Sequence, residues 1–341
     1  MAGTGTLHLR PESNRVLSVE DLVVEFPAKG GQTVHAVSGI SFDVLPGETL
    51  GILGESGCGK SSAGRALMQL PPPTSGSVRL DDDELTDVRG RALRRARARM
   101  QMIFQDPVSS LNPRRKVKDL VAEGPRIRGQ KVDDERIRAS LRAAGLDPDV
   151  VWDRRPHELS GGQCQRVSIA RALMLEPQIL ICDEPVSSLD VSVQAQILNL
   201  LEDTKQRYRL SLIFIAHDLA VVKNISDRIM IMYLGKICEV VPAGRLARHA
   251  AHPYTRLLLE SVPEEHLPGG EAPVGDEERA ANEGADRGTH RPPAELPSPL
   301  NPPSGCRFRT RCPLATDVCA DTEPEMRALA DGHFVACHHA G

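Results

Sequence analysis

The feature that most constrains this 341-residue chain is its glycine-rich string G-E-S-G-C-G-K-S, residues 54–61. An apolar run at 49–53 precedes the string and a helical pattern at 61–70 follows it, so the sequence predicts a strand, a glycine turn and a helix. Glycines let successive backbone N–H groups converge on one anion, and the helix start adds the positive end of its dipole. This order predicts a turn that binds phosphate.

The residue types within the turn specify its chemistry. Lys60 can reach the β and γ phosphates of a nucleotide, and the Ser61 hydroxyl can be a ligand of Mg²⁺. For this motif taken alone, the alternative is an ordinary glycine turn in front of a helix. The residues predicted to contact the nucleotide here are Gly54, Glu55, Ser56, Gly57, Cys58, Gly59, Lys60, Ser61 and Ser62.

A second predicted strand ends in two carboxylates. The apolar stretch 179–182 is typical of a central parallel strand buried on both faces, and Asp183 and Glu184 follow it directly. Ligands of open α/β sheets bind at the carboxyl ends of the strands. We therefore expect Asp183 to hold Mg²⁺ and Glu184 to act as the base on the attacking water. An isolated Asp-Glu pair is more often a strand cap with solvated acids.

The pentapeptide L-S-G-G-Q at 159–163 stands between these two motifs, in front of a helical run that contains Ile169 and Leu173. With this string, the chain resembles the ATP-binding subunits of ABC transporters. The resemblance implies an α/β P-loop NTPase cassette with a RecA-like parallel sheet core, an antiparallel β subdomain and a helical subdomain. It also implies a head-to-tail dimer. The residues that would contact the ATP bound to the partner are Ser160, Gly161, Gly162, Gln163 and Asp190.

The same resemblance assigns further roles around the nucleotide. Gln105 would sense Mg²⁺ and water, and His217, after the apolar strand 212–216, would contact the γ phosphate. Phe26 would stack on the adenine, with His35 as the alternative. No Asn-Lys-x-Asp guanine-reading motif occurs, which favours ATP over GTP. The catalytic set is thus Glu184, His217, Gln105 and Lys60, and the Mg²⁺ set is Ser61, Gln105 and Asp183.

Composition limits the partners and the cellular location that the chain can have. The net charge of −4 does not favour nucleic acid as a partner, although six arginines crowd into residues 89–99, where a solvated face is the simpler interpretation. No apolar run approaches the roughly 20 residues that span a bilayer, and residues 1–15 contain no signal-peptide segment. We expect a protein on the cytoplasmic face of the cell membrane, bound peripherally.

Periodicity and composition divide the chain into three parts. Residues 16–262 form the expected ATPase domain, with a helical subdomain at about 106–160 in which Ile137, Leu141 and Ala144 supply one apolar face. Residues 263–303 are acidic and proline-rich, a composition that predicts a flexible linker. Residues 304–341 form a small cysteine-rich extension.

Half of the eight cysteines lie in that extension, at Cys306, Cys312, Cys319 and Cys337. Clustered thiols in a reducing compartment are more often metal ligands than disulfides. Four thiolates suit Zn²⁺ or an iron–sulfur cluster, and the lack of a tight C-x2-C pair favours [4Fe–4S]. Zn²⁺, free thiols or a redox disulfide stay open, and His338 and His339 allow a mixed ligand set.

Four longer sequence segments indicate a particular group within the ABC transporter ATPases. Residues 105–114, 190–196, 252–255 and 305–312 look like the oligopeptide and dipeptide importers, in particular their F-type ATPase subunit. The resemblance implies ATP hydrolysis that drives uptake of such peptides, together with a D-type sister ATPase or a second copy of the chain, two membrane permeases and an extracytoplasmic substrate-binding protein. In some members it also implies an iron–sulfur cluster. The alternatives are an importer for nickel or glycosides, an exporter, or an ABC ATPase outside transport.

Overall fold

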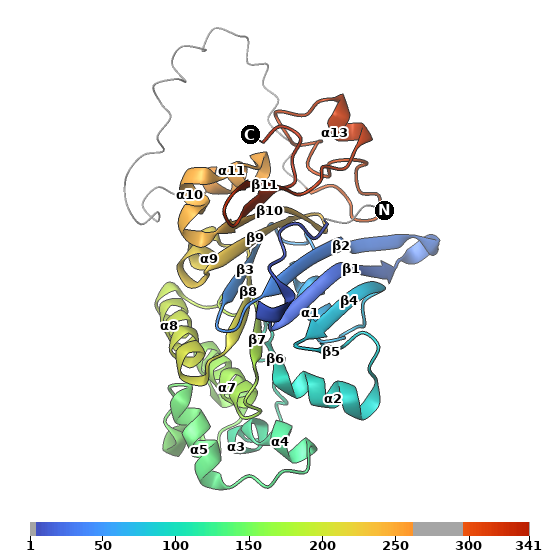
Figure 1. The fold of residues 1–341 in the computed structure, drawn as a ribbon. Helices are drawn as coiled ribbons and strands as arrows, with labels where there is room; N and C mark the ends of the chain where they lie inside the picture. The colour runs from blue at the N-terminus through green and yellow to red at the C-terminus, as the bar shows by residue number, and fades with distance from the viewer. Residues whose placement is uncertain (1–4, 262–295, 341) are drawn as a thin grey trace.

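The computed structural model describes residues 5–261 and 296–340, which build two β-sheets and the helices around them (Figure 1). A four-stranded antiparallel sheet has the order β2-β1-β4-β5, and an eight-stranded sheet has the order β11-β12-β10-β9-β3-β8-β7-β6. The strands are β1 (Leu17–Pro27), β2 (Thr33–Val44), β3 (Thr49–Leu53), β4 (Ser75–Leu80), β5 (Asp83–Glu84), β6 (Met100–Ile103), β7 (Ile179–Asp183), β8 (Ser211–Ala216), β9 (Arg228–Tyr233), β10 (Lys236–Pro242), β11 (Arg327–Ala330) and β12 (His333–Val335).

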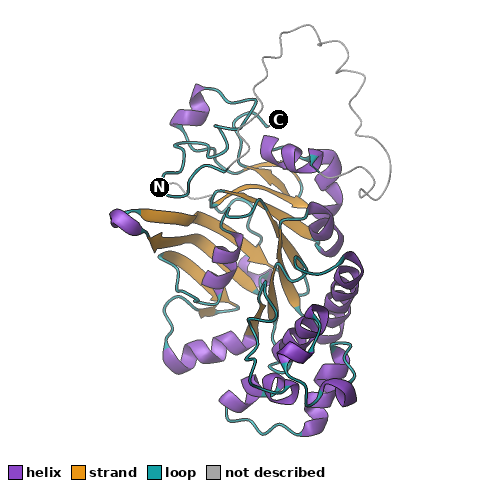
Figure 2. Ribbon diagram, turned by 180° about the vertical axis from the view of Figure 1, so that it is seen from behind, coloured by secondary structure: helices purple, strands orange, loops and turns teal. Residues whose placement is uncertain are grey.

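Helices flank the larger sheet, and those between β6 and β7 gather at one end of the molecule, as the view from behind also shows (Figure 2). The α-helices are α1 (Lys60–Leu67), α2 (Gly90–Arg99), α3 (Val117–Val121), α4 (Glu123–Ile127), α5 (Asp134–Ala143), α6 (Pro148–Val151), α7 (Gly161–Leu173), α8 (Val191–Tyr208), α9 (Leu219–Ile225), α10 (Leu246–His249), α11 (Pro253–Glu260) and α13 (Asp317–Asp321). Short 3-10 helices are η1 (Glu12–Asn14), η2 (Lys29–Gly31), η3 (Pro156–Glu158) and η4 (Ala243–Arg245).

The centre of the larger sheet is parallel. Strand β3 pairs in parallel with β8 and β9, and β7 pairs in parallel with β8 and β6. The strands predicted at 49–53, 179–182 and 212–216 are therefore confirmed as β3, β7 and β8. Because parallel strands run in one direction, their carboxyl ends meet at one edge of the sheet, and the loops that follow them come together there.

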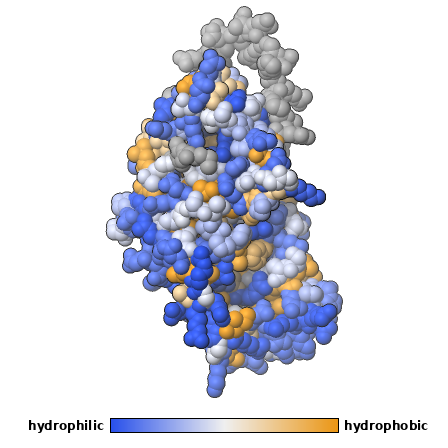
Figure 3. All heavy atoms as spheres, turned by 90° about the vertical axis from the view of Figure 1, so that its right-hand side faces the viewer, coloured by the Kyte–Doolittle hydropathy of each residue, from blue (hydrophilic) through white to orange (hydrophobic). Residues whose placement is uncertain are grey.

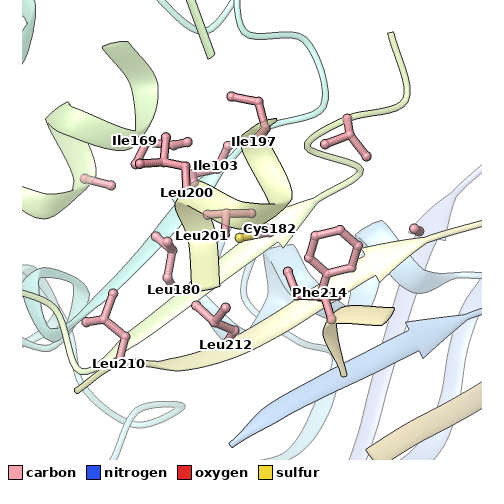
Figure 4. Packing of buried hydrophobic residues seen from close by; sticks show 14 of the residues in the cluster. Ile103, Ile169, Leu180, Cys182, Ile197, Leu200, Leu201, Leu210, Leu212 and Phe214 are labelled. Carbon is pink, nitrogen blue, oxygen red and sulfur yellow. The ribbon is translucent and has the colours of Figure 1, made fainter. Parts of the chain in front are cut away.

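Aliphatic side chains hold helix α8 against this sheet. Ile197 and Leu201 of α8 belong to the same buried cluster as Leu180 of β7 and Phe214 of β8 (Figure 4). Each of the four is 0% exposed, and burying a side chain of this size stabilises the fold by about 1.5–3 kcal/mol. This packing fixes the strand ends that carry the polar residues of the site.

Helix α1 lies between the two sheets. Its Ala63, Ala66 and Leu67 share a buried cluster with residues of β1, β2, β3 and β8. The helix predicted over 61–70 is shorter in the structure, because Gln69 adopts a left-handed φ of 57° that α-helical backbone cannot take. Helices α3 to α6 follow β6, and the predicted apolar face of Ile137, Leu141 and Ala144 is buried.

The cysteine-rich extension continues the ATPase sheet, which the sequence patterns did not indicate. Strand β12 pairs antiparallel with β10, with Val335 opposite Glu239, and β11 pairs with β12. The extension thereby supplies two strands at one edge of the eight-stranded sheet. Most of the linker predicted at 263–303 lies outside the described residues, which resume at 296.

One face is largely hydrophilic, with apolar residues scattered over it (Figure 3). Within residues 5–261 and 296–340, none of the helices combines the length and apolar character that crossing a bilayer requires.

Candidate nucleotide-binding site

The glycine-rich turn connects β3 to α1, as predicted, and two of its glycines are required by its shape. Gly59 precedes α1 with a φ of 105°, a conformation that L side chains rarely adopt. At Gly54, a Cβ atom would lie 2.2 Å from the carbonyl oxygen of Met232 in β9. The backbone therefore curls tightly against the sheet, and its N–H groups and the first turn of α1 form a cradle suited to phosphate.

Lys60 is held inside this turn. Its Nζ donates hydrogen bonds to the carbonyl oxygens of Gly54, at 2.7 Å, and Glu55, at 3.0 Å, and the residue is 3% exposed. Of the neighbouring loop residues, Ser56 and Gly57 are exposed, while Cys58 is buried and burial raises the pKa of its thiol. The loop thus presents one confined ammonium group to an incoming anion.

Ser61 and Asp183 form the metal-binding corner that the sequence predicts. Ser61 Oγ donates to Asp183 Oδ1 at 2.6 Å, and Asp183 is 0% exposed. Asp183 Oδ2 is buried and accepts no hydrogen bond from any described residue, although Arg65 Nη2 lies 3.6 Å from it. Burial also raises the pKa of Asp183. A buried carboxylate with a free oxygen beside a serine hydroxyl fits Mg²⁺.

Glu184 stands where the ends of three strands meet. Its Oε2 accepts a hydrogen bond from Gln105 Nε2 at 3.0 Å and lies 3.3 Å from Nδ1 of His217. Gln105 follows β6, Glu184 follows β7 and His217 follows β8, so the parallel sheet brings together three residues that the sequence singles out separately. A carboxylate oriented by an amide and an imidazole can accept a proton from water.

The L-S-G-G-Q loop builds the start of α7 rather than part of this cradle. Ser160 Oγ accepts the Gln163 N–H at 3.2 Å, and Gln163 Oε1 accepts the Ser160 N–H at 3.0 Å, which is a capping box. At Gly162, a Cβ would lie 2.8 Å from Cγ1 of Val193, so glycine lets α7 approach α8. Across the described residues, no hydrogen bond joins this loop to the glycine-rich turn.

The other two predicted contacts of the nucleotide occupy defined positions. Asp190 caps α8, where its Oδ1 accepts the Val193 N–H at 3.0 Å. Phe26 in β1 pairs with Val34 of β2, two residues before Ala36, whose carbonyl oxygen lies against Gly59. Phe26 is therefore beside the cradle. The roles of Phe26 in adenine stacking and of Asp190 across a dimer stay predictions.

Sequence reasoning missed the residues that hold the glycine-rich turn from outside. Arg311 in the extension forms an ion pair with Glu55, and the Tyr254 hydroxyl accepts the Glu55 N–H. Both residues stand in strings that resemble the importer family, residues 305–312 and 252–255, but nothing local in those strings indicates contact with the turn. Arg65, one turn into α1, was also missed.

The four cysteines of the extension are free thiols in one small region. Cys319 and Cys337 are buried, and Cys306 and Cys312 are partly buried. Burial is the main cause that raises the pKa of Cys306 to about 11, and the charges of the nearby thiols add to the increase. Among the described residues, no three His, Cys, Asp or Glu side chains converge closely enough to hold a metal ion. The described residues therefore favour neither the iron–sulfur cluster nor the Zn²⁺ site over the other.

Comparisons with known proteins now place the chain in a family. A family model described as ABC transporter matches residues 37–187, and one described as oligopeptide/dipeptide transporter, C-terminal region, matches 238–285 and 279–319. The oligopeptide transport ATP-binding protein OppF of Salmonella typhimurium is 45% identical over 335 residues, 94% of this chain and 95% of that protein. The chain belongs to the ATP-binding subunits of the peptide ABC transporters. The family predicted from the sequence is confirmed, and this subunit is an ABC ATPase.

Solved structures support the same fold for the peptide-transporter ATPase. A structure of cbiO1 from Clostridium perfringens, part of the ABC transporter complex cbiONQ, has a TM-score of 0.59 and 28% identity, covering 68% of this chain and 90% of that one. The ATP-binding cassette MJ0796, a dimer bound to ADP and Pi, has a TM-score of 0.61 and 25% identity, covering 67% and 98%. The predicted ABC cassette fold is thereby confirmed.

Proposed function

We propose that this ABC ATPase drives the import of oligopeptides or dipeptides. The observation that carries the proposal is the 45% identity to an oligopeptide transport ATP-binding protein along 94% of the chain. The meeting of Gln105, Glu184 and His217 around one carboxylate oxygen supports the hydrolytic part of it.

In this proposal, different residues around the turn bind the nucleotide, hold Mg²⁺ and activate the attacking water. Lys60 and the N–H groups of residues 54–62 bind the phosphates of ATP, and Phe26 stacks on the adenine. Ser61, Asp183 and Gln105 would hold Mg²⁺, which neutralises charge that develops on the phosphates. Glu184 accepts a proton from the attacking water, while the Gln105 amide and His217 keep its carboxylate aimed at that water.

Two such subunits would form a head-to-tail dimer in which residues 160–163 and Asp190 of one subunit contact ATP on the other. The exposed Ser160 N-cap, with the positive end of α7 behind it, suits a phosphate. The partner is a D-type sister ATPase or a second copy of this chain. Dimer closure and opening would move two permease subunits, and a substrate-binding protein outside the cell would supply the cargo. The subunit then sits peripherally on the cytoplasmic face of the membrane.

The domain division is part of the proposal: an ATPase domain at 16–262 with a helical subdomain at about 106–160, a linker at 263–303 and a metal-binding region at 304–341. For that region we propose a [4Fe–4S] cluster on Cys306, Cys312, Cys319 and Cys337. The support is four free thiols in one region of the chain, of which Cys319 and Cys337 are buried and Cys306 and Cys312 partly buried.

Iron and acid-labile sulfide in the anaerobically purified full chain test this assignment. We expect both in the wild type and a loss of both in Cys312→Ser, while Cys164→Ser, at a buried cysteine of α7, keeps them. A wild-type protein without iron would refute the cluster.

Glu184→Gln tests the hydrolytic assignment. The variant should bind MgATP like the wild type but release phosphate about 100-fold more slowly or worse, because the general base is gone. Glu260→Gln, at an exposed glutamate that ends α11, is the matched control and should turn over normally. Normal turnover by Glu184→Gln would refute the assigned base.

A test of the transported substrate requires the assembled transporter. With the permeases and the binding protein in vesicles, peptide should stimulate ATP hydrolysis. Stimulation by nickel or a glycoside instead would refute the peptide assignment and leave the ATPase assignment intact.

A further inference from the structure

The glycine-rich turn is held by the C-terminal part of the chain through Glu55. Arg311 Nη1 donates to Glu55 Oε2 at 2.7 Å and Arg311 Nη2 donates to Oε1 at 3.0 Å, a two-pronged pair that fixes both distance and orientation. The Arg311 side chain is only 6% exposed. The backbone N–H of Glu55 also donates to the hydroxyl of Tyr254 at 2.9 Å, so the side chain and the backbone of one turn residue are both restrained.

Arg311 is itself held in place by a backbone hydrogen bond and by buried aromatic side chains. Its N–H donates to the carbonyl oxygen of Phe308 at 2.9 Å, and its guanidinium lies 5.7 Å from the ring centre of Tyr233. The ring centres of Tyr233 and Phe308 are 5.2 Å apart, and those of Tyr254 and Phe308 are 5.4 Å apart. Tyr233 and Tyr254 are 0% exposed and Phe308 is 2% exposed. A guanidinium shielded in this way keeps a fixed direction toward Glu55.

A second set of contacts links the extension to Cys58 of the turn. Arg307 Nη1 donates to the carbonyl oxygen of Leu234, and the N–H of the next residue, Gly235, donates to the carbonyl oxygen of Cys58 at 2.8 Å. The segment between Cys306 and Cys312 therefore contacts the turn directly at Glu55, and reaches Cys58 through Leu234 and Gly235. Both points belong to the turn that holds Lys60.

We propose that Arg311 is a positioning residue for nucleotide binding: through Glu55 it sets the shape of the phosphate-binding turn, so that the cysteine-rich extension contributes to the affinity for ATP. Lys60 Nζ is bound by the carbonyl oxygens of Gly54 and Glu55, so a displacement of Glu55 moves the atoms that place the ammonium. The inference rests on the proposed nucleotide site. If Arg311 only anchored the extension, its removal would leave nucleotide affinity unchanged.

The test measures MgADP binding by calorimetry, and kcat and KM for ATP, in the full chain. Arg311→Ala should weaken binding and raise KM by about 5- to 20-fold, in the lower part of the usual range for coupling between sites, with kcat within about twofold of the wild type. Arg309→Ala is the matched control, because Arg309 lies in the same segment, is only partly buried, and its guanidinium donates to Ser304 and not to the glycine-rich turn. It should bind MgADP like the wild type.

A double-mutant cycle shows whether Arg311 acts through Glu55. In a Glu55→Gln background, Arg311→Ala should weaken binding by less than about twofold, since the partner carboxylate is already gone. Arg311→Lys keeps the positive charge but cannot form the two parallel hydrogen bonds to Glu55, so its affinity for MgADP should lie between those of the wild type and Arg311→Ala. If Arg311→Ala fails to fold by circular dichroism, Arg311→Lys and Glu55→Gln carry the test.

Two results would overturn the inference. One is wild-type MgADP affinity in folded Arg311→Ala, and the other is an equal loss with and without Glu55→Gln. Lys60→Ala separates this failure from a failure of the site. Undiminished binding by Lys60→Ala would refute the proposed nucleotide site, whereas lost binding there with retained binding in Arg311→Ala refutes only the role of Arg311.

Discussion

Acidification from pH 7 to pH 5 is expected to destabilise the protein through His252. This residue is 2% exposed, its Nδ1 accepts the Tyr254 N–H at 3.0 Å in front of α11, and its ring centre lies 5.7 Å from that of Phe308. Burial lowers the pKa of His252 to about 4, against the opposing effect of the Glu239 carboxylate. A protonated ring would lose the Tyr254 hydrogen bond and place a charge among aromatic side chains.

The magnitude follows from proton linkage. The unfolded chain binds a proton at His252 near the ordinary pKa of 6.5, whereas the folded protein does so only near pH 4, so stability is lost as the pH falls through this window. These two values give a loss of about 2 kcal/mol between pH 7 and pH 5, and a limit of about 3 kcal/mol below pH 4. Glu239 has a lowered pKa, because its hydrogen bonds outweigh its burial, and its own titration falls below this interval.

Urea unfolding at pH 7 and pH 5, followed by circular dichroism, measures the loss. His252→Asn supplies the matched variant, because asparagine can still accept the Tyr254 N–H at the helix start but does not titrate. Burial also lowers the pKa of His8, which adds the same loss to both proteins and cancels in the comparison. His249→Asn, at an exposed site on α10, should keep the wild-type dependence. An undiminished loss of stability in His252→Asn would refute the reasoning.

Two further predictions concern the site. Ser160→Ala removes the acceptor of the Gln163 N–H and should lower the free energy of unfolding by about 1 kcal/mol, and it should slow phosphate release at least about tenfold if Ser160 contacts the ATP bound to the partner. The control is Asp147→Ala, which removes the comparable cap of α6 and should leave the rate of phosphate release unchanged. Equal effects of the two variants on phosphate release would contradict the role of Ser160. Asp183→Asn should raise the Mg²⁺ concentration needed for half-maximal ATP hydrolysis about tenfold or more, because it replaces the buried carboxylate beside Ser61, and an unchanged Mg²⁺ requirement would show that the metal binds elsewhere.

The central sheet could be predicted because its signals are local and strong. The strand at 179–183 is buried at every position and begins with the apolar run 179–182, which is typical of a strand inside a parallel sheet. Once β6, β7 and β8 are parallel, the residues after them share one edge, which places Gln105, Glu184 and His217 together without knowledge of any loop.

The C-terminal contacts could not be predicted, because no local pattern encodes them. Strand β12 has three residues and β11 has four exposed ones, so neither gives the alternation by which strands are recognised. Arg311 and Glu55 lie 256 positions apart. Within its own segment, Arg311 reads as an ordinary basic residue beside a cysteine, and its burial becomes apparent only when Tyr233 and Phe308 are packed around it.

The extension docks on the ATPase through three sets of contacts between described residues: the pairing of β12 with β10, the rings around Phe308, and Arg311 on Glu55. Because the last of these contacts is a residue of the glycine-rich turn, the docking of the extension and the shape of the ATP site share one interaction, and a change at either end is felt at the other.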